Sequence, residues 1–321
     1  MEGGGGEKVD DVKSVLVCRG GALGDFVVTL PVLAELRRRW PAARLDLLAY
    51  PRHAVLAQAG GLADGVRSLD EAGLAAWFDS SDRDLPAAEA RYVAGYDRVY
   101  CLLHDPEGVV RGKLARVVGR GLACLTPLVT DTHAVDHFLK IVRDEAGAPM
   151  PGGAPHLCLP TEFIAAARRR WRSRGGPVIL HPGSGSAAKN WPLERYLELA
   201  RRLAAGTEFN PVFLLGEAEA SMGSRLGVEF PVLAGLSVLE AAAVLATCEL
   251  TVANDSGIAH LAAAGGARVV ALFGPTDPFL WGPRGPRASV VRAVPPTAAG
   301  LASLTVERVW AASQAGPSDA A

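Results

Sequence analysis

The stretch VANDSGIAHL (residues 252–261) is followed at residues 269–278 by VVALFGPTDP, and these two pieces decide the fold. Each begins as a short apolar strand and ends in a turn rich in small and polar residues, and the first turn opens a helix. Strands alternating with helices form a parallel sheet, which binds ligands at the carboxyl ends of its strands. The free N–H groups and positive end of the helix that follows Ser256 suit a phosphate. The sequence therefore predicts an α/β protein that handles a nucleotide or another phosphorylated molecule.

The alternation of strands and helices occurs twice along the chain. The first unit opens with a strand at residues 15–18, a glycine-rich turn and a helix at 26–40, in which Pro31 requires either a kink or a helix start at Thr29. A segment rich in Pro and Gly at 147–155 predicts a linker, after which the alternation restarts with a strand at 178–181. The other expected elements are strands at 45–49, 98–103, 212–215, 250–253 and 268–273, and helices at 163–174, 192–203, 237–247 and 306–312.

This pattern predicts two doubly wound domains of the α/β class that face a central cleft. We expect the first domain at residues 13–150 and the second at 151–300. A disordered tail at 1–12 precedes them, and a terminal helix with a second disordered tail follows at 301–321.

Composition excludes several classes of protein. The net charge of −1 gives no reason to expect a nucleic-acid partner. The chain has no run of 18 apolar residues, and its start resembles no secretory signal, so we expect a cytoplasmic protein with at most peripheral contact at the inner membrane face. The five cysteines are far apart and form no CxxC pair or Cys/His cluster, so we expect no zinc site and reduced core thiols. We also expect no cofactor.

The turn GGALGD at residues 20–25 lacks the GxGxxG spacing of a dinucleotide fingerprint. Its glycines allow another molecule to approach the backbone closely. Asp25 then stands at the start of a helix, where two roles are open. It could be an N-cap, which is common for Asp, or a carboxylate in the cleft that takes a proton from an acceptor hydroxyl.

A second glycine-rich turn, HPGSGSAAKNWP, spans residues 181–192. Its small residues leave backbone N–H groups accessible, while Ser184 and Ser186 add hydroxyl groups and Lys189 adds a positive charge. Such a loop can hold a diphosphate and stabilise the charge that develops on a leaving phosphate. The alternative is a solvated loop with a surface lysine.

Other polar residues stand at the expected strand ends and helix starts. Glu217 and Glu219 follow a strand, where a carboxylate can bind ribose hydroxyls or complement a helix dipole. Asp255 could be an N-cap, a ligand contact or both, and His260 has a packed, hydrogen-bonded role as its plainer interpretation. A set of basic residues at near-helical spacing forms either a solvated face or a contact for an anionic acceptor; these are Arg111, Lys113, Arg116 and Arg120.

Taken together, these motifs resemble glycosyltransferase family 9, the family of ADP-heptose:lipopolysaccharide heptosyltransferases. The resemblance runs in order from residue 13 to about 311. Its pieces are GALGD (21–25) with TLP (29–31), HAVD (133–136), HPGS (181–184) with KNWP (189–192), NDSG (254–257) with HL (260–261), and GPTDP (274–278).

The resemblance implies a GT-B fold of two Rossmann-like domains, inversion at the anomeric carbon and no metal requirement. Asp82 and Asp84 imitate a metal-binding DxD motif, but they lie far from the expected nucleotide loops and are discounted. The implied donor is a nucleotide sugar, ADP-heptose above others, and the implied acceptor is a glycan or glycolipid of the lipopolysaccharide core.

The resemblance also implies a role for each candidate residue. Asp25 becomes the general base, and Lys189 the residue that stabilises the diphosphate. The implied nucleotide-sugar contacts are Ser184, Ser186, Lys189, Glu217, Glu219, Asp255, Ser256, Gly257, His260, Gly274, Pro275 and Thr276. The implied acceptor contacts are Gly21, Gly24, Arg111 and Lys113.

Three alternatives remain open at this point. The chain could be a family 9 transferase with another donor or acceptor, a sugar-nucleotide epimerase of the same architecture, or an inactive protein that only binds a nucleotide sugar. The sequence fixes neither the sugar, the base, the acceptor nor the oligomeric state.

Overall fold

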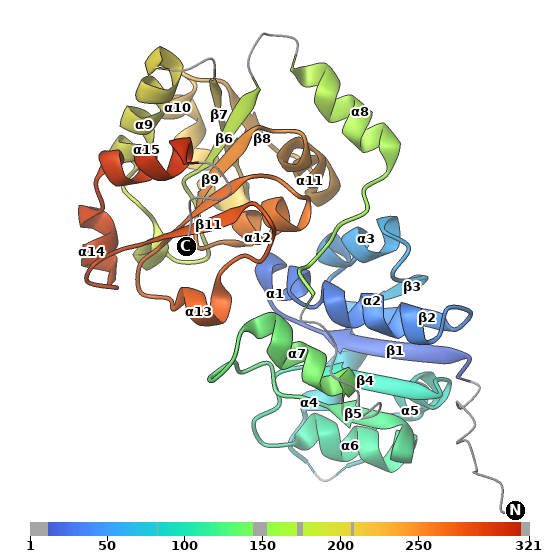
Figure 1. Ribbon diagram of the computed structural model, residues 1–321. Helices are drawn as coiled ribbons and strands as arrows, with labels where there is room; N and C mark the ends of the chain where they lie inside the picture. The colour runs from blue at the N-terminus through green and yellow to red at the C-terminus, as the bar shows by residue number, and fades with distance from the viewer. Residues whose placement is uncertain (1–11, 82, 144–152, 172–175, 207–208, 316–321) are drawn as a thin grey trace, which may run out of the picture.

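The computed structural model describes residues 12–81, 83–143, 153–171, 176–206 and 209–315. It contains two parallel β-sheets, each flanked by helices (Figure 1). The predicted α/β class with two doubly wound units is therefore confirmed.

The first sheet has the strand order β3-β2-β1-β4-β5. Its strands are β1 (Ser14–Arg19), β2 (Arg44–Ala49), β3 (Gly65–Ser68), β4 (Arg98–Leu102) and β5 (Leu122–Cys124). The helices of this unit are α1 (Leu23–Val27), α2 (Leu30–Arg39), α3 (Pro51–Ala59), α4 (Ala75–Phe78), α5 (Ala87–Ala94), α6 (Val109–Val118) and α7 (Ala134–Arg143). The strand order reverses between β1 and β4, and that reversal creates a crevice at their carboxyl ends.

The second sheet has the order β11-β10-β9-β6-β7-β8, which is the doubly wound order of a Rossmann sheet. Its strands are β6 (Pro177–His181), β7 (Asn210–Leu215), β8 (Val232–Ala234), β9 (Leu250–Asn254), β10 (Val269–Phe273) and β11 (Ala288–Arg292). The accompanying helices are α8 (Thr161–Arg170), α9 (Leu193–Gly206), α10 (Gly223–Leu226), α11 (Val238–Ala246), α12 (Gly257–Ala264), α13 (Pro278–Trp281), α14 (Ala298–Ser303) and α15 (Val306–Gln314). Here the order reverses between β6 and β9.

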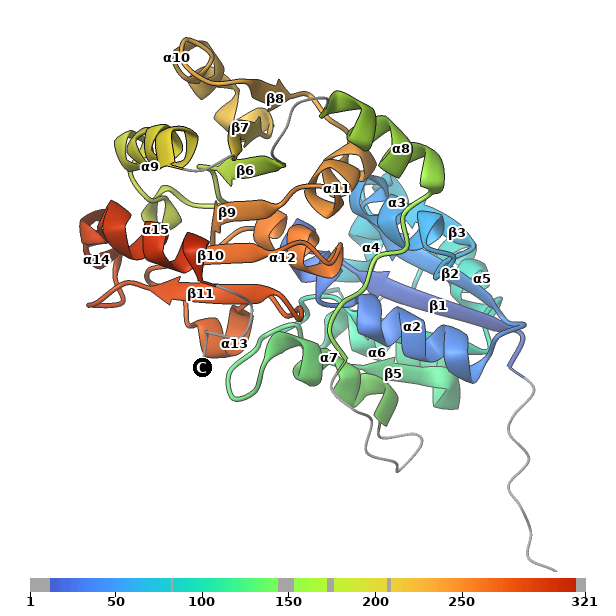
Figure 2. The same ribbon diagram turned by 45° about the horizontal axis from the view of Figure 1, so that its top comes forward.

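Of the hydrophobic clusters among the described residues, one runs from the first unit into the second. It joins buried residues of the first unit, such as Phe26 and Ala54, to residues of α11 and α12, such as Ala242 and Leu261. The helices that carry these residues lie side by side where the two sheets meet, with α3 against α11 and α1 against α12 (Figure 2). Burial of this apolar surface holds the two units together.

The helix expected at residues 26–40 is divided in the structure. It consists of α1 and α2, with Thr29 directly before α2 and Pro31 in the first turn of α2. The alternative of a helix start at Thr29 is the one that the structure adopts, because proline has no N–H to donate and is tolerated in a first turn. The expected linker lies partly outside the described residues, which resume at Gly153.

The sequence analysis did not predict β3, β5, β8 and β11, and these four strands form the edges of the two sheets. An edge strand is only half covered, so it needs no continuous apolar run to mark it. Residue 12, assigned to the disordered tail, is a buried Val12. Three of the five cysteines are buried, as expected of core thiols, but Cys158 is exposed and Cys124 is half-buried.

Among the described residues, no helix is both long enough and apolar enough to cross a membrane.

Candidate active site

The carboxyl ends of β1 and β9 lead into α1 and α12, and the first turns of these two helices pack against each other (Figure 1). Two glycines allow the contact. A Cβ on Gly257 would lie 2.8 Å from Leu23 Cβ and 3.0 Å from the backbone nitrogen of Gly24. A Cβ on Gly24 would lie 3.2 Å from the His260 ring. Larger residues would separate the helices, so Gly24 and Gly257 set the distance between the two units.

A cavity of about 220 Å³ opens beside this contact. Both units contribute to its wall, which is formed by Ala22, Gly24, Asp25, Gly185, Lys189, Asp255, Ser256, Gly257, His260, Thr276 and Trp281. We call this space the interdomain cleft. It brings together many of the residues that the sequence singled out, although Gly24 and Thr276 are 252 positions apart.

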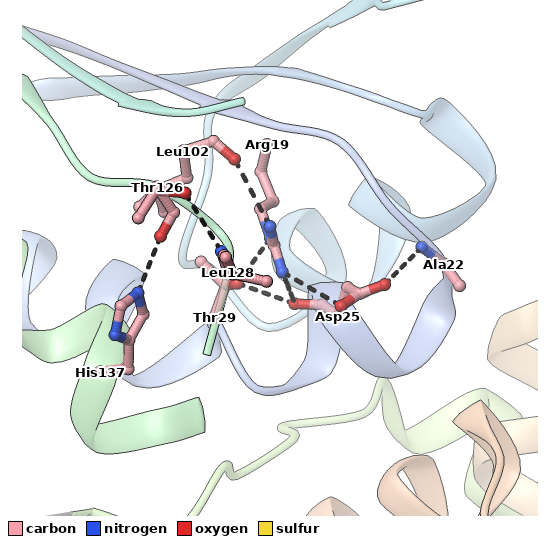
Figure 3. A network of polar contacts seen from close by, with 8 residues as sticks. All are labelled: Arg19, Ala22, Asp25, Thr29, Leu102, Thr126, Leu128 and His137. Carbon is pink, nitrogen blue, oxygen red and sulfur yellow. Dashed lines mark hydrogen bonds and ion pairs between the residues drawn. The ribbon is translucent and has the colours of Figure 1, made fainter. Parts of the chain in front are cut away.

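Asp25 occupies the third position of α1, not the N-cap position (Figure 3). Its Oδ2 accepts a hydrogen bond of 2.9 Å from the backbone N–H of Ala22, and its Oδ1 lies 3.5 Å from Nη2 of Arg19. About a third of the side chain remains exposed. The carboxylate therefore closes the start of the helix and still faces open space, so the two roles weighed for Asp25 do not exclude each other.

Gly21, at the turn before α1, has a φ of 93°. A Cβ at that position would lie 2.8 Å from Oδ2 of Asp25. Both the positive φ and the lack of space require glycine, because an L side chain would displace the carboxylate.

Arg19, at the end of β1, was not identified from the sequence. Its side chain is 3% exposed, and its guanidinium lies 4.4 Å above the centre of the Phe138 ring. It donates to the carbonyl of Asp25 at 2.9 Å, to Oγ1 of Thr29 at 3.0 Å and to the carbonyl of Leu102 at 3.4 Å (Figure 3). Burial lowers the pKa of Arg19 to about 10, although the nearby Asp25 charge acts in the opposite direction. Arg19 thus stays charged at neutral pH and fixes the turn that carries Asp25.

Lys189 and Asp255 form the ion pair of the second unit. Lys189 ends a short 3₁₀ turn at Ala187–Lys189, and its Nζ lies 2.8 Å from Oδ2 of Asp255. The lysine side chain is 34% exposed, whereas the aspartate is 7% exposed. The structure therefore holds a cation at the mouth of the cleft on a buried anion.

Asn254, one position before Asp255, is fully buried and connects three segments. Its Oδ1 accepts from the N–H of Trp191 and from the Tyr196 hydroxyl, each at 3.0 Å. Its Nδ2 donates to the carbonyl of Pro182 at 2.8 Å. These bonds fix the loop that carries Lys189 against β9. The sequence did not identify this role, because nothing local to Asn254 shows which distant groups it meets.

Ser184 and Ser186 form bonds within their own loop. Oγ of Ser184 lies 2.7 Å from both the carbonyl of Ser186 and Oδ1 of Asn190. Oγ of Ser186 accepts from the N–H of Ala188 at 3.3 Å. In the part of the chain that the structure describes, the wall of the cleft includes Gly185 but neither serine. The hydroxyls shape the loop, and direct contact with a diphosphate remains a prediction.

Glu219 is 7% exposed and accepts a bond of 3.0 Å from the N–H of Gly216. A Cβ on Gly183 would overlap its carboxylate, so Glu219 packs directly beneath the second glycine-rich turn. Glu217 is exposed. Neither belongs to the described wall of the cleft, and their contact with a ribose remains a prediction.

The three residues of the GPT turn after β10 have different surroundings. A Cβ on Gly274 would lie 2.9 Å from Leu301 Cβ, so this glycine allows α14 to pack closely. Pro275 is exposed, and Thr276 lines the cleft. Trp281, which was not identified from the sequence, adds an aromatic wall at the end of α13.

His260 is 5% exposed and lies against Gly24. Burial lowers its pKa to about 4, against the opposing effect of the Asp255 and Asp25 charges. The imidazole is therefore neutral near pH 7. A buried, neutral imidazole agrees with the packed role that the sequence favoured for His260. Because His260 also lines the cleft, its contact with a ligand stays a prediction.

The HAVD segment joins the two units at a second place. Nε2 of His133 lies 2.8 Å from the carbonyl of Gly282, and Asp136 pairs with Arg284. Gly282 follows directly after Trp281 of the cleft wall, and Arg284 lies three positions after Trp281. This contact connects the first unit to the α13 segment of the second.

A second cavity, of about 410 Å³, lies in the first unit beside the turn of Asp25. We call it the first-unit pocket. Its wall is formed by Arg19, Gly20, Gly21, Asp25, Tyr50, Leu69, Phe78, Leu102, Leu103, His104 and Pro127. Asp25 lines both this pocket and the interdomain cleft, so its carboxylate stands between the two spaces.

Two predicted acceptor contacts lie elsewhere on α6. Lys113 is 3% exposed, and its Nζ donates to the carbonyls of Ala76 at 2.8 Å and Asp79 at 2.6 Å. The interpretation of Lys113 as part of a solvated basic face is therefore wrong, because its ammonium stabilises the α4 segment. Arg111 is exposed on the same helix but is absent from the described wall of the first-unit pocket.

Of the two aspartates that resemble a DxD motif, Asp82 and Asp84, only Asp84 lies among the described residues. Asp84 pairs with Arg116 at 2.7 Å, and Asp82 lies outside the described residues. Among the residues that are described, no group of three or more His, Cys, Asp or Glu side chains could hold a metal ion.

Comparison with solved structures shows the same fold in heptosyltransferases. The E. coli ADP-heptose lipopolysaccharide heptosyltransferase II superposes with a TM-score of 0.76 at 19% identity, covering 94% of this chain and 97% of that one. The E. coli heptosyltransferase WaaC, solved with ADP, gives a TM-score of 0.69 at 21% identity, covering 92% and 97%. The expected GT-B arrangement is thus confirmed.

Comparison of sequences agrees. Lipopolysaccharide heptosyltransferase 1 of Pseudomonas aeruginosa is 28% identical over 297 residues, which cover 84% of this chain and 81% of the relative. The family model described as "Glycosyltransferase family 9 (heptosyltransferase)" matches residues 125–307, more than half of the chain. The protein therefore belongs to glycosyltransferase family 9, the heptosyltransferase family.

Proposed function

We propose that this protein transfers heptose from ADP-heptose to a glycan acceptor of the lipopolysaccharide core or a related glycan, with inversion of the anomeric carbon and without a metal ion. The observation that carries the proposal is the position of Asp25 between two cavities. One cavity suits a donor and the other an acceptor. A transferase needs both substrates to meet at one proton-accepting group.

The interdomain cleft suits the diphosphate of the donor. The N-terminal turn of α12, with Ser256 and Gly257 in the cleft wall, presents N–H groups and the positive end of the helix dipole. Lys189 adds a full positive charge. These groups could take the place of a divalent cation beside the leaving diphosphate. The choice of ADP as nucleotide is supported by the heptosyltransferase relatives and by the related WaaC structure that contains ADP.

In the proposed reaction, an acceptor hydroxyl in the first-unit pocket attacks the anomeric carbon of the donor from the face opposite the diphosphate. The new C–O bond forms as the bond to the diphosphate breaks, and the bonding electrons leave with the phosphate oxygen. The hydroxyl proton goes to the Asp25 carboxylate. Attack from the opposite face inverts the configuration, and it also prevents the leaving diphosphate from accepting that proton.

The test incubates the full chain with ADP-heptose and a heptose-deficient lipopolysaccharide core, with ADP release and product mass as readouts. We expect ADP release that depends on the acceptor, and a product heavier by one heptose with inverted configuration. The reaction should persist in excess chelator. Release of a free epimerised sugar nucleotide without acceptor would identify an epimerase, and ADP binding without turnover on any acceptor would identify a binding protein.

The nucleotide is tested separately by calorimetry with ADP, UDP, GDP, CDP and dTDP. A Kd for ADP at least tenfold below the others supports the donor assignment. Clear binding of UDP or GDP with no binding of ADP would overturn it.

A further inference from the structure

Three of the five cysteines lie in one row across the first sheet, on the neighbouring strands β1, β4 and β5 (Figure 1). Cys18 of β1 is the register partner of Cys101 of β4, and Cys101 is the partner of Cys124 of β5. The three side chains share one face of the sheet and belong to the hydrophobic cluster that α4 and α6 complete. The Cys101 thiol is hydrogen-bonded to the thiols of both neighbours. We call this set the cysteine row.

The spacing of the cysteine row allows a disulfide. Neighbouring strands of a sheet lie about 4.8 Å apart, and the Cα atoms of disulfide-bonded cysteines are about 4.4–6.8 Å apart. The sulfur–sulfur bond, at about 2.05 Å, is shorter than any hydrogen bond between thiols, so the two strands must move slightly to form it. In the part of the chain that the structure describes, no group of three or more His, Cys, Asp or Glu side chains could hold a metal ion, so the row is not a metal site.

The three thiols differ in their access to solvent. Cys18 and Cys101 are 0% and 4% exposed, whereas Cys124 is half-buried and belongs to the edge strand β5. An oxidant in solution therefore meets Cys124 first, and the thiol next to it is that of Cys101. The hydrogen bond with Cys101 and burial raise the pKa of Cys124, so little thiolate is present at neutral pH and the first step is slow.

We propose that Cys101 and Cys124 form a reversible disulfide when the protein is exposed to a peroxide. The Cys124 thiolate attacks one oxygen of hydrogen peroxide, the O–O bond breaks, and hydroxide leaves with the bonding electrons, which gives a sulfenic acid. The Cys101 thiolate then attacks the Cys124 sulfur and displaces a second hydroxide. The protons that the two thiols release convert both hydroxides into water. The two sulfurs together lose two electrons, and the peroxide gains them.

The disulfide would act on the first-unit pocket. Residues 102–104 follow Cys101 directly and line this pocket, and Pro127, three positions after Cys124, lines it as well. Drawing the ends of β4 and β5 together displaces this part of the wall. Resting on the proposed function, in which the pocket takes the acceptor, the disulfide should slow transfer and leave ADP affinity unchanged.

The test maps the disulfide without any substrate. The full chain is treated with hydrogen peroxide, its remaining thiols are blocked in denaturant, and it is digested with trypsin without reductant. Each cysteine of the row falls on its own peptide, at residues 14–19, 99–111 and 121–140. We expect peptide 99–111 linked to peptide 121–140, and release of the two by dithiothreitol. A link from 14–19 to 99–111 in its place overturns the proposal, and so does a fully reduced row in protein whose exposed Cys158 has been oxidised.

Three variants test the order of the steps. Cys124→Ser should leave Cys101 reduced, because the buried thiol then has no oxidised neighbour. Cys101→Ser should stop the reaction at Cys124, where the peptide gains the mass of one oxygen. Cys158→Ser is the matched control, because it removes an exposed thiol outside the row and should leave the yield of the link unchanged. A link that is lost in Cys158→Ser would show that it forms by exchange between molecules, and would overturn the proposed steps.

Transfer is then compared between reduced and fully linked protein. The rate at subsaturating acceptor should fall by about tenfold on oxidation, because small displacements of a bound substrate have effects of this size or larger. Dithiothreitol should restore the rate, and Cys124→Ser should be insensitive to peroxide. Wild-type transfer by fully linked protein, or a loss of ADP affinity in calorimetry, would overturn the action on the first-unit pocket.

Failure of this inference and failure of the proposed function are distinguishable. Peptide mapping reports on the disulfide and needs neither donor nor acceptor. If the link forms and the reduced protein transfers no heptose to any acceptor, the proposed function fails and the disulfide stands. If the reduced protein transfers heptose and the link does not form, only the disulfide is wrong.

Discussion

Nζ of Lys189 lies 2.8 Å from Oδ2 of Asp255, so the cation expected to meet the donor diphosphate rests on a carboxylate that is 7% exposed. The pair links the second glycine-rich turn to the strand end before α12. It holds the lysine at the cleft without a ligand, and the ammonium can turn toward a diphosphate while it keeps contact with Asp255.

Lys189→Met should weaken ADP binding and slow transfer, because one charged hydrogen bond to the diphosphate is worth roughly 1.5–3 kcal/mol. The variant leaves the buried Asp255 without its cation, so unfolding by urea must be measured alongside calorimetry. Asp255→Asn in the Lys189→Met background should restore stability but not ADP affinity. ADP affinity equal to that of the wild type in Lys189→Met would return this residue to a purely structural role.

Asp25→Asn should reduce the transfer rate by about 10²–10⁴-fold, the usual size of a general-base contribution. The amide oxygen can still accept from the N–H of Ala22, so the start of α1 keeps its bond while basicity is lost. ADP affinity should stay within twofold of the wild type. Single-turnover kinetics measure the rate, and transfer at the wild-type rate would show that the base lies elsewhere.

Asn254→Ala should destabilise the protein by roughly 2–4 kcal/mol, because the buried N–H of Trp191 and the Tyr196 hydroxyl both lose their acceptor. ADP affinity should fall as well, since the loop that carries Lys189 loses its attachment to β9. The control is Ser184→Ala, which removes a half-buried hydroxyl of the same loop whose bonds stay within that loop. Urea unfolding compares the two, and equal stability of both variants would contradict the role of Asn254.

The ion pair between Asp136 and Arg284 should stabilise the folded protein, so the effects of removing the two charges should not be additive. Both side chains are about 30% exposed, so we expect a modest coupling energy of about 0.5–1 kcal/mol in a double-mutant cycle of Asp136→Asn and Arg284→Gln. The exchanged pair, Asp136→Arg with Arg284→Asp, should recover part of the loss. Strictly additive effects on urea unfolding would mean that the two charges do not hold the units together.

Acid should destabilise the protein before its carboxylates are protonated. Burial lowers the pKa of His260 from 6.5 to about 4, and it also lowers the pKa of His133 and His181. Between about pH 6.5 and 4 the unfolded chain binds protons that the folded protein does not, so the free energy of unfolding falls as the pH falls through this window. The free energy of unfolding should be lower at pH 4.5 than at pH 7.5. His260→Gln should reduce that difference by roughly 1–3 kcal/mol. An unchanged pH dependence in this variant would show that folding does not lower the pKa of His260.

The sequence by itself determined the elements that are marked by local chemistry. The apolar runs at β1, β6, β9 and β10 are buried on both faces of their sheets and therefore leave a continuous signal. The glycine-rich turns after β1 and β6 and the NDSG turn after β9 identified Asp25, Lys189 and Asp255 as candidates, because these turns follow strands of a predicted parallel sheet. The edge strands left no such signal, since only one of their sides is paired.

Only the tertiary structure decided which of these residues meet. Arg19 holds the first glycine-rich turn through partners 6 to 83 positions away along the chain. Asn254 holds the second glycine-rich turn through partners 58 to 72 positions away. No local sequence pattern encodes partners at such distances. Lys113 shows the opposite case, because its spacing suggested a solvated face while packing of α6 on α4 buried its ammonium. The close approach of Gly24 and Gly257 then placed Asp25 between two cavities, and this follows from the packing of one unit on the other, which no single segment of the chain determines.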